Sequence, residues 1–81
     1  MTPKITAVKV ESGHRLAVDF ENGERGILDM TPFLDFGVFR ALQDSACFAQ
    51  AGVAFGTIEW PGGIDLDPAF VHEKCKMQVT A

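Results

Sequence analysis

The chain has 81 residues, of which 47% are hydrophobic, which fits one small folded domain and excludes a disordered segment. Its formal net charge of −4 disfavours binding to DNA or RNA, because nucleic-acid binders present a basic face to the phosphates. Two cysteines make no disulfide framework, and no apolar run or signal-peptide pattern points to a membrane, so we expect a soluble, cytoplasmic protein with reduced thiols.

The first third of the chain predicts a three-stranded antiparallel β-meander. Residues 4–10 are β-branched, and residues 15–20 alternate apolar and polar side chains, which is typical of a half-buried strand. Asn22-Gly23 precedes the returning strand at residues 25–30. This dipeptide favours a type I′ hairpin turn, which needs positive φ at both central positions. We expect one face of the meander to be exposed to water.

Short helices are expected after the meander, because the apolar spacing changes to a helical one. Thr31 is a candidate N-cap followed by Pro32, which suits the first position of a helix. Asp44 is a candidate N-cap for a further short helix that ends at Gly52. These segments would lay their apolar sides on the sheet.

The last third of the chain predicts a further strand and a C-terminal helix. Residues 53–60 return to a β pattern, in which Gly56 indicates a bulge or a tight turn. Asp67 is a candidate N-cap and Pro68 a first helical residue, so the last helix begins there. We expect residues 76–81 to fray.

The stretch "IEWPGGIDLDP", residues 58–68, holds the residues that are candidates for a binding site. Its glycines expose backbone N–H groups to an anion, but the two following aspartates would repel a phosphate. Those aspartates and the preceding Glu59 have the chemistry of a divalent-cation site, although the spacing of a calcium loop is missing. A corner required only by the fold is the preferred interpretation. The candidate residues are Trp60, Gly62, Gly63, Asp65 and Asp67.

A zinc site and a catalytic site are both disfavoured by the spacing of the thiols and imidazoles. His14, Cys47, His72 and Cys75 lack the paired spacings of zinc modules, so we expect no metal and no cofactor. His72 and Cys75 are the only neighbouring Cys–His couple, and no adjacent feature indicates an activated thiol. We expect no catalytic residue and no enzyme activity.

The order of these features resembles a bacterial family, the domain of unknown function 2442. The resemblance covers about residues 5–71 and is carried by "ENGE", "LDMTPFLDFGVFRAL" and "FGTIEWPGGIDLDP". It implies a compact α+β fold without an established activity, often encoded beside another small protein as in toxin–antitoxin-like pairs. Gly62 stands where the family typically has asparagine, which weakens a role for an amide side chain at that position.

We therefore predict a single α+β domain over residues 1–81, with a three-stranded antiparallel meander followed by short helices, a further strand and a C-terminal helix. We expect a non-catalytic protein-interaction domain, the acidic partner of a small basic protein encoded nearby. It would bind no nucleic acid and no membrane, and a strand edge offers a route to a homo-oligomer. The alternative function is binding of a small ligand or divalent metal at the corner between Trp60 and Asp67.

Overall fold

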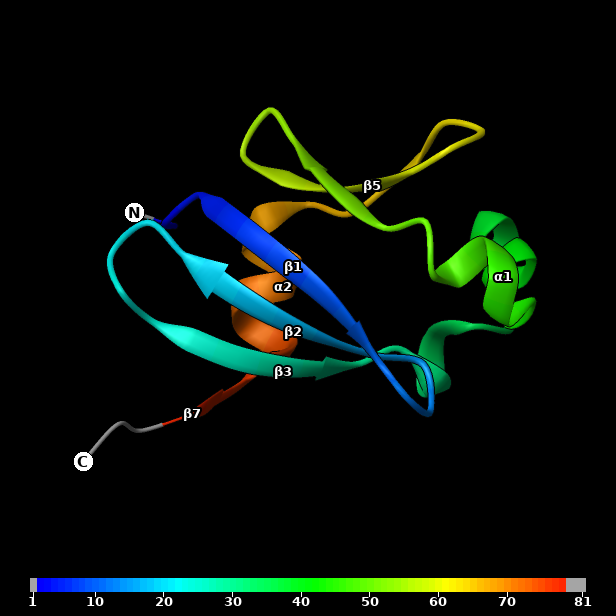
Figure 1. Cartoon of the computed structure of the whole chain (residues 1–81), viewed down its shortest axis with the longest axis horizontal. Helices are drawn as coiled ribbons and strands as arrows, with labels where there is room; N and C mark the ends of the chain where they lie inside the picture. The colour runs from blue at the N-terminus through cyan, green and yellow to red at the C-terminus, as the bar shows by residue number, and fades with distance from the viewer. Residues whose placement is uncertain (1, 79–81) are drawn as a thin grey trace.

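The computed structural model describes residues 2–78 and contains two antiparallel sheets, with short helices packed against them (Figure 1). The larger sheet has the strand order β1-β2-β3-β7, and the smaller one has the order β4-β5-β6. The strands are β1 (Ile5–Glu11), β2 (Arg15–Phe20), β3 (Arg25–Asp29), β4 (Gly52–Ala54), β5 (Thr57–Trp60), β6 (Ile64–Asp65) and β7 (Lys76–Gln78). The helical segments are the 3₁₀ helices η1 (Thr31–Phe33) and η2 (Gly37–Gln43) and the α-helices α1 (Ser45–Phe48) and α2 (Pro68–Lys74). The α+β class is confirmed.

The predicted meander is present as β1, β2 and β3. Leu16, Val18 and Phe20 are buried along β2, while the residues between them are half-buried on the opposite face. Leu16 pairs with Leu28 of β3, which places two buried side chains next to each other on the inner face. The period-two pattern therefore identified both the strand and its buried face.

The turn between β2 and β3 differs from the expected type I′ geometry. Of its residues, Gly23 alone has positive φ, at 89°. Gly23 N donates to Phe20 O at 3.1 Å, and Phe20 N donates to Glu24 O at 2.9 Å. This pattern belongs to a three-residue loop closed by a left-handed glycine. Asn22 Oδ1 accepts a hydrogen bond from Glu24 N, so the Asn22 side chain stabilises the loop. The backbone of Asn22 does not have positive φ.

The helical segments after the meander are shorter than expected. Thr31 is not an N-cap: it is the first residue of η1, and its N–H donates to Asp29 Oδ1 at 2.9 Å. Asp44 does cap α1, since its side chain accepts from Ala46 N. α1 nevertheless ends at Phe48 rather than near Gly52, because the chain leaves the helix to enter β4.

The single strand expected over residues 53–60 is a hairpin. β4 and β5 pair through Ala54 and Thr57, so the turn between them consists of Phe55 and Gly56. Both residues have positive φ, 53° and 76°, as a type I′ turn requires. The tight turn expected at Gly56 is therefore confirmed, whereas a continuous strand through it is wrong.

The last helix begins as predicted, but the chain after it does not fray at once. Asp67 Oδ1 accepts from Ala69 N at 2.9 Å, and Pro68 is the first residue of α2. Residues Lys76–Gln78 then form β7, which pairs antiparallel with β3 so that Lys76 lies opposite Ile27 and Gln78 opposite Arg25. The outer edge of β3 has backbone groups left to pair, and β7 satisfies them. Residues 79–81 lie outside the described part of the chain.

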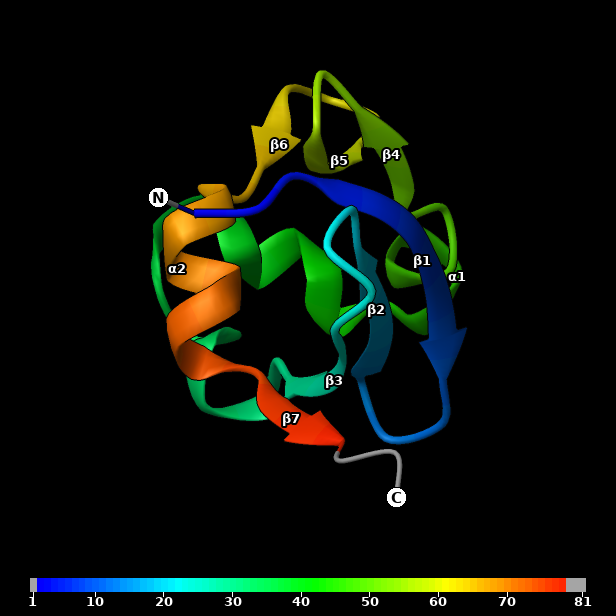
Figure 2. The ribbon, with the colours of Figure 1, turned by 90° about the vertical axis from the view of Figure 1, so that its left-hand side faces the viewer.

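One hydrophobic cluster joins both sheets and the helices. In Figure 2, α2 lies across the interior from β1 and β2, and the smaller sheet closes the top of the molecule. The buried members come from every part of the chain: Ile5, Leu16, Val18, Phe20, Leu28, Met30, Leu34, Leu42, Phe48, Ile58, Trp60, Ile64, Leu66, Val71 and Cys75. Within residues 2–78, no helix is both long and apolar enough to cross a membrane.

Candidate functional site

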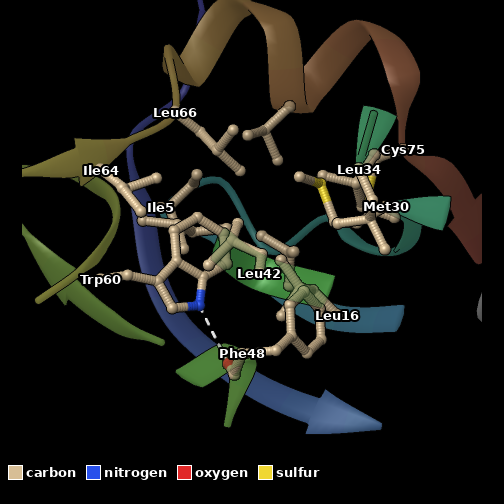
Figure 3. Close-up of a cluster of buried hydrophobic side chains, with 14 of the residues drawn as sticks. Ile5, Leu16, Met30, Leu34, Leu42, Phe48, Trp60, Ile64, Leu66 and Cys75 are labelled. Carbon is tan, nitrogen blue, oxygen red and sulfur yellow. Dashed lines mark hydrogen bonds between the residues drawn. The ribbon is translucent and has the colours of Figure 1, made fainter. Parts of the chain in front are cut away.

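Trp60 is a core residue and not an open binding surface. It lies at the end of β5 and is 2% exposed. Its Nε1 donates to Phe48 O at 2.9 Å, and the two ring centroids are 5.9 Å apart (Figure 3). The hydrogen bond satisfies the one polar atom that the buried indole carries. Trp60 thus anchors the smaller sheet to α1, as the architectural interpretation expected.

Gly62 and Gly63 form a tight reversal between β5 and β6. Trp60 pairs with Ile64, so only Pro61 and the two glycines lie between the strands. Their φ values are 94° and 82°, in the left-handed region that favours glycine. A Cβ at either position would meet nothing within 4 Å. The glycines are therefore explained by backbone conformation, and no close neighbour requires the missing side chains.

The carboxylates of the corner have separate roles. Glu59 and Asp65 are partners across β5 and β6, so their exposed side chains share one face of the sheet. Asp67 lies beyond β6 and caps α2. Among residues 2–78, no three His, Cys, Asp or Glu side chains gather closely enough to hold a metal ion. The structure therefore brings two of the three candidate metal ligands together.

A shallow hollow of about 410 Å³ adjoins the corner. Its one charged lining residue is Glu59, and the rest of its wall is glycine backbone, apolar side chains and one amide. The lining residues are Gln50, Gly52, Val53, Glu59, Trp60, Pro61, Gly62 and Gly63. Ligand pockets usually bury most of the ligand's surface, whereas this hollow is open to solvent.

His72 is engaged with a carboxylate rather than with a cysteine. His72 Nε2 lies 3.0 Å from Glu24 Oε1, and its ring meets Phe20 edge-on at 5.2 Å. Hydrogen bonds from Asn22 and then from His72 hold the pKa of the Glu24 carboxyl below its ordinary value. The contact connects α2 to the turn between β2 and β3.

The buried Cys75 thiol is not activated by its surroundings. Cys75 is 8% exposed, and burial raises its pKa to about 11, so the thiol stays protonated near neutral pH. Cys47 is half-buried on the last helical turn of α1. His14 packs edge-on against Phe48 at 5.0 Å, and its buried Nε2 has no hydrogen-bond partner within residues 2–78.

Among the side chains that the structure describes, three large hydrophobic ones are exposed, and the sequence did not single them out. Phe55 is 101% exposed, Phe36 is 64% exposed and Val53 is 39% exposed. Phe55 stands at the tip of the β4–β5 hairpin with positive φ. The available signal was the Phe-Gly pair, but turns of this type favour Asn-Gly or Asp-Gly, so the pattern read as a strand.

A family model described as "Protein of unknown function (DUF2442)" matches residues 5–76. The match runs from the first residue of β1 to the first residue of β7. It therefore covers strands β1 to β6 and every helical segment. No curated protein and no solved structure matches the chain.

Proposed function

The chain belongs to the family described as Protein of unknown function (DUF2442), and from this premise we propose that it is a non-catalytic protein-interaction domain. The observation that carries the proposal is Phe55, a large apolar side chain that is 101% exposed at a hairpin tip. Exposed aromatic residues are enriched among the anchors of protein interfaces. An exposed aromatic residue at a hairpin tip is suited to contact with another molecule.

The character of the buried residues supports a non-catalytic role. Within residues 2–78, the buried side chains are apolar. Cys75 is the one buried residue in this range with a titratable group, and burial raises the pKa of its thiol. Catalytic acids and bases usually owe a shifted pKa to a cleft that holds them. Here the pKa of Glu24 is lowered by hydrogen bonds from Asn22 and His72. The pKa of Cys75 is raised by its burial in the core.

Charge supports a basic protein as the partner. The chain carries a net charge of −4, and acidic surfaces attract cationic partners over long range. A small basic protein encoded nearby, as the family resemblance implies, has the required chemistry. That partner, the cytoplasmic location and the absence of nucleic-acid binding stay predictions.

The alternative, a small ligand or a divalent metal at the corner, has less support. Trp60 is buried in the core, Asp67 caps α2, and the glycines satisfy a turn. Each candidate residue of the corner except Asp65 therefore has a structural task.

Affinity purification of the tagged full chain at low expression, followed by native mass spectrometry, tests the interaction. We expect a stoichiometric complex with a second protein, which persists after chelator treatment. A chain that elutes alone under every condition, or a complex that chelation dissolves, would contradict the proposed function.

A further inference from the structure

We infer that the β4–β5 hairpin tip at Phe55 is the anchor of the interaction, and that it inserts into an apolar pocket on a partner protein that carries cationic side chains on the side facing Glu59 and Asp65. This inference rests on the proposed function and adds the site and the chemistry of the partner to it.

Phe55 is a residue that folding does not need. Its side chain is 101% exposed, so it buries nothing within the chain. Its φ of 53° is in the left-handed region, which strains residues with a Cβ and is tolerated best by glycine and asparagine. Both features count against phenylalanine on grounds of stability. An aromatic side chain at this position therefore matches a role in contact with another molecule.

The hairpin tip is held in place by the rest of the fold. Ile5 N donates to Gly56 O at 2.9 Å, which ties the turn to the start of β1. The stem of Lys4 lies directly over Gly56, since a Cβ there would be 3.1 Å from Lys4 Cγ. In Figure 1 the turn projects at the upper left, beside the beginning of β1. A tip that is already ordered loses little conformational entropy when it binds, which favours affinity.

The smaller sheet carries two negatively charged side chains, Glu59 and Asp65, close to each other. Glu59 and Asp65 are cross-strand partners and exposed, and neither forms an ion pair within residues 2–78. Like charges directly opposite each other destabilise a sheet. Cationic groups on a partner would relieve this repulsion. Glu59 lies two residues beyond Thr57, the first residue of β5 after the turn, which is about 7 Å along the strand and within the span of a standard interface.

Charge also decides between a different protein and a second copy of this chain. A two-fold pairing through this face would bring the carboxylates of both copies together and double the repulsion between them. A cationic partner gains from the same groups. We therefore assign the hairpin tip to a contact with a basic protein, and self-association becomes an outcome of the test.

The experiment combines photo-crosslinking with titration of the captured protein. A benzophenone amino acid is placed at position 55 of the full chain, and separately at position 36, in the cells that produce it. The protein captured at position 55 is then purified and titrated by calorimetry with the wild type and the variants. We expect it to be basic, and we expect position 36 not to capture it.

Phe55→Asn is the decisive variant, and Phe36→Asn is its control. Asparagine adopts the left-handed conformation readily, so Phe55→Asn should melt at or above the wild-type temperature. We expect it to raise the Kd at least about tenfold, as loss of an aromatic anchor does. Phe36→Asn makes the same chemical change at a residue that is 64% exposed, and it should leave the Kd unchanged.

The charges are tested by Glu59→Gln combined with Asp65→Asn. This pair of changes should weaken binding at low salt and matter little at high salt, where exposed charges are screened. If a complex forms whose Kd is indifferent to Phe55→Asn, the anchor is refuted while the interaction function stands. Capture of a second copy or of an acidic protein at position 55 overturns the stated partner chemistry. If no protein is captured at position 55 and none co-purifies, both the anchor and the interaction function fail.

Discussion

At the scale of single residues, the corner consists of side chains with separate tasks. Trp60 fills the core and donates a hydrogen bond to Phe48 O, whereas Asp67 caps α2. Asp65 is exposed opposite Glu59 and performs neither task. Substitutions at these neighbouring positions should therefore differ sharply in their effect on stability.

Trp60→Ala should lower the free energy of unfolding by about 3–5 kcal/mol, the usual cost of truncating a large buried aromatic residue. A domain this small starts near the lower end of about 5–15 kcal/mol, so the variant should be barely folded. Asp67→Ala should cost about 0.5–2 kcal/mol through loss of the N-cap. Urea denaturation measures both. Asp65→Ala is the control, and a loss as large as that of Asp67→Ala would contradict the architectural interpretation.

Cys75 should resist alkylation while the protein is folded. Its pKa of about 11 and its 8% exposure leave little thiolate to react and little access to it. In a Cys47→Ser variant, which isolates this thiol, iodoacetamide at mildly alkaline pH should label Cys75 much faster in denaturant than in buffer. Labelling of the folded protein at the rate of an exposed free thiol would show that Cys75 is not held in the core.

At the scale of elements, short segments are connected by contacts between distant parts of the chain. The turn between β2 and β3 meets α2 through Glu24 and His72, whose side-chain atoms are 3.0 Å apart. β7 extends the meander by pairing with β3, and Ile5 N of β1 holds the β4–β5 turn through Gly56 O. These contacts let elements as short as β4 and β7, with three residues each, stay in place.

Glu24 should make stability depend on pH in the acidic range. Its folded pKa lies below 4.5, so the carboxylate contributes stability above that value and loses it as the pH falls through the folded pKa. Glu24→Gln removes this contribution. Urea midpoints of wild type and variant should differ near neutral pH and converge well below pH 4.5. The reverse pattern, with a difference that grows on acidification, would contradict the lowered pKa.

At the scale of the whole molecule, the open surfaces are sheet edges and the hairpin tip. β1 and β7 are the outer strands of the larger sheet. β1 is the longer one with seven residues, and its start at Ile5 is bonded to Gly56 of the β4–β5 turn. Unpaired backbone groups along an edge strand are a template for pairing with another chain. Arg25 and Asp19 form an exposed ion pair on this sheet at 3.2 Å, which contributes little to stability.

Any self-association of the chain should proceed through the edge of β1. Ala7 is exposed on this strand, so Ala7→Lys adds a charge there at little cost to the core. Light scattering across a concentration series should show association in the wild type that Ala7→Lys weakens. Ala41→Lys makes the same change at an exposed position of η2 and should leave association intact. A strict monomer at high concentration would count against the edge.

The sequence alone determined the features that depend on neighbouring residues. Period-two alternation located β2 and its buried face at Leu16, Val18 and Phe20, because side chains alternate across a strand. Asp44 and Asp67 were recognised as caps, because a cap bonds to the backbone two residues ahead. The corner was correctly expected to be a reversal between core residues, since its proline and glycines specify the turn locally.

Tertiary structure decided the features that depend on distant partners. Residues 53–60 read as one strand, and they fold as a hairpin whose turn is held by Ile5 and Lys4, about fifty positions earlier in the chain. β7 exists because β3 offers it an unpaired edge. The exposure of Phe55 follows from that hairpin, for which the Phe55-Gly56 pair is only a weak local signal. Local bonds are specified by a few adjacent residues, whereas strand pairing and exposure are specified by whichever surfaces the folded chain brings together.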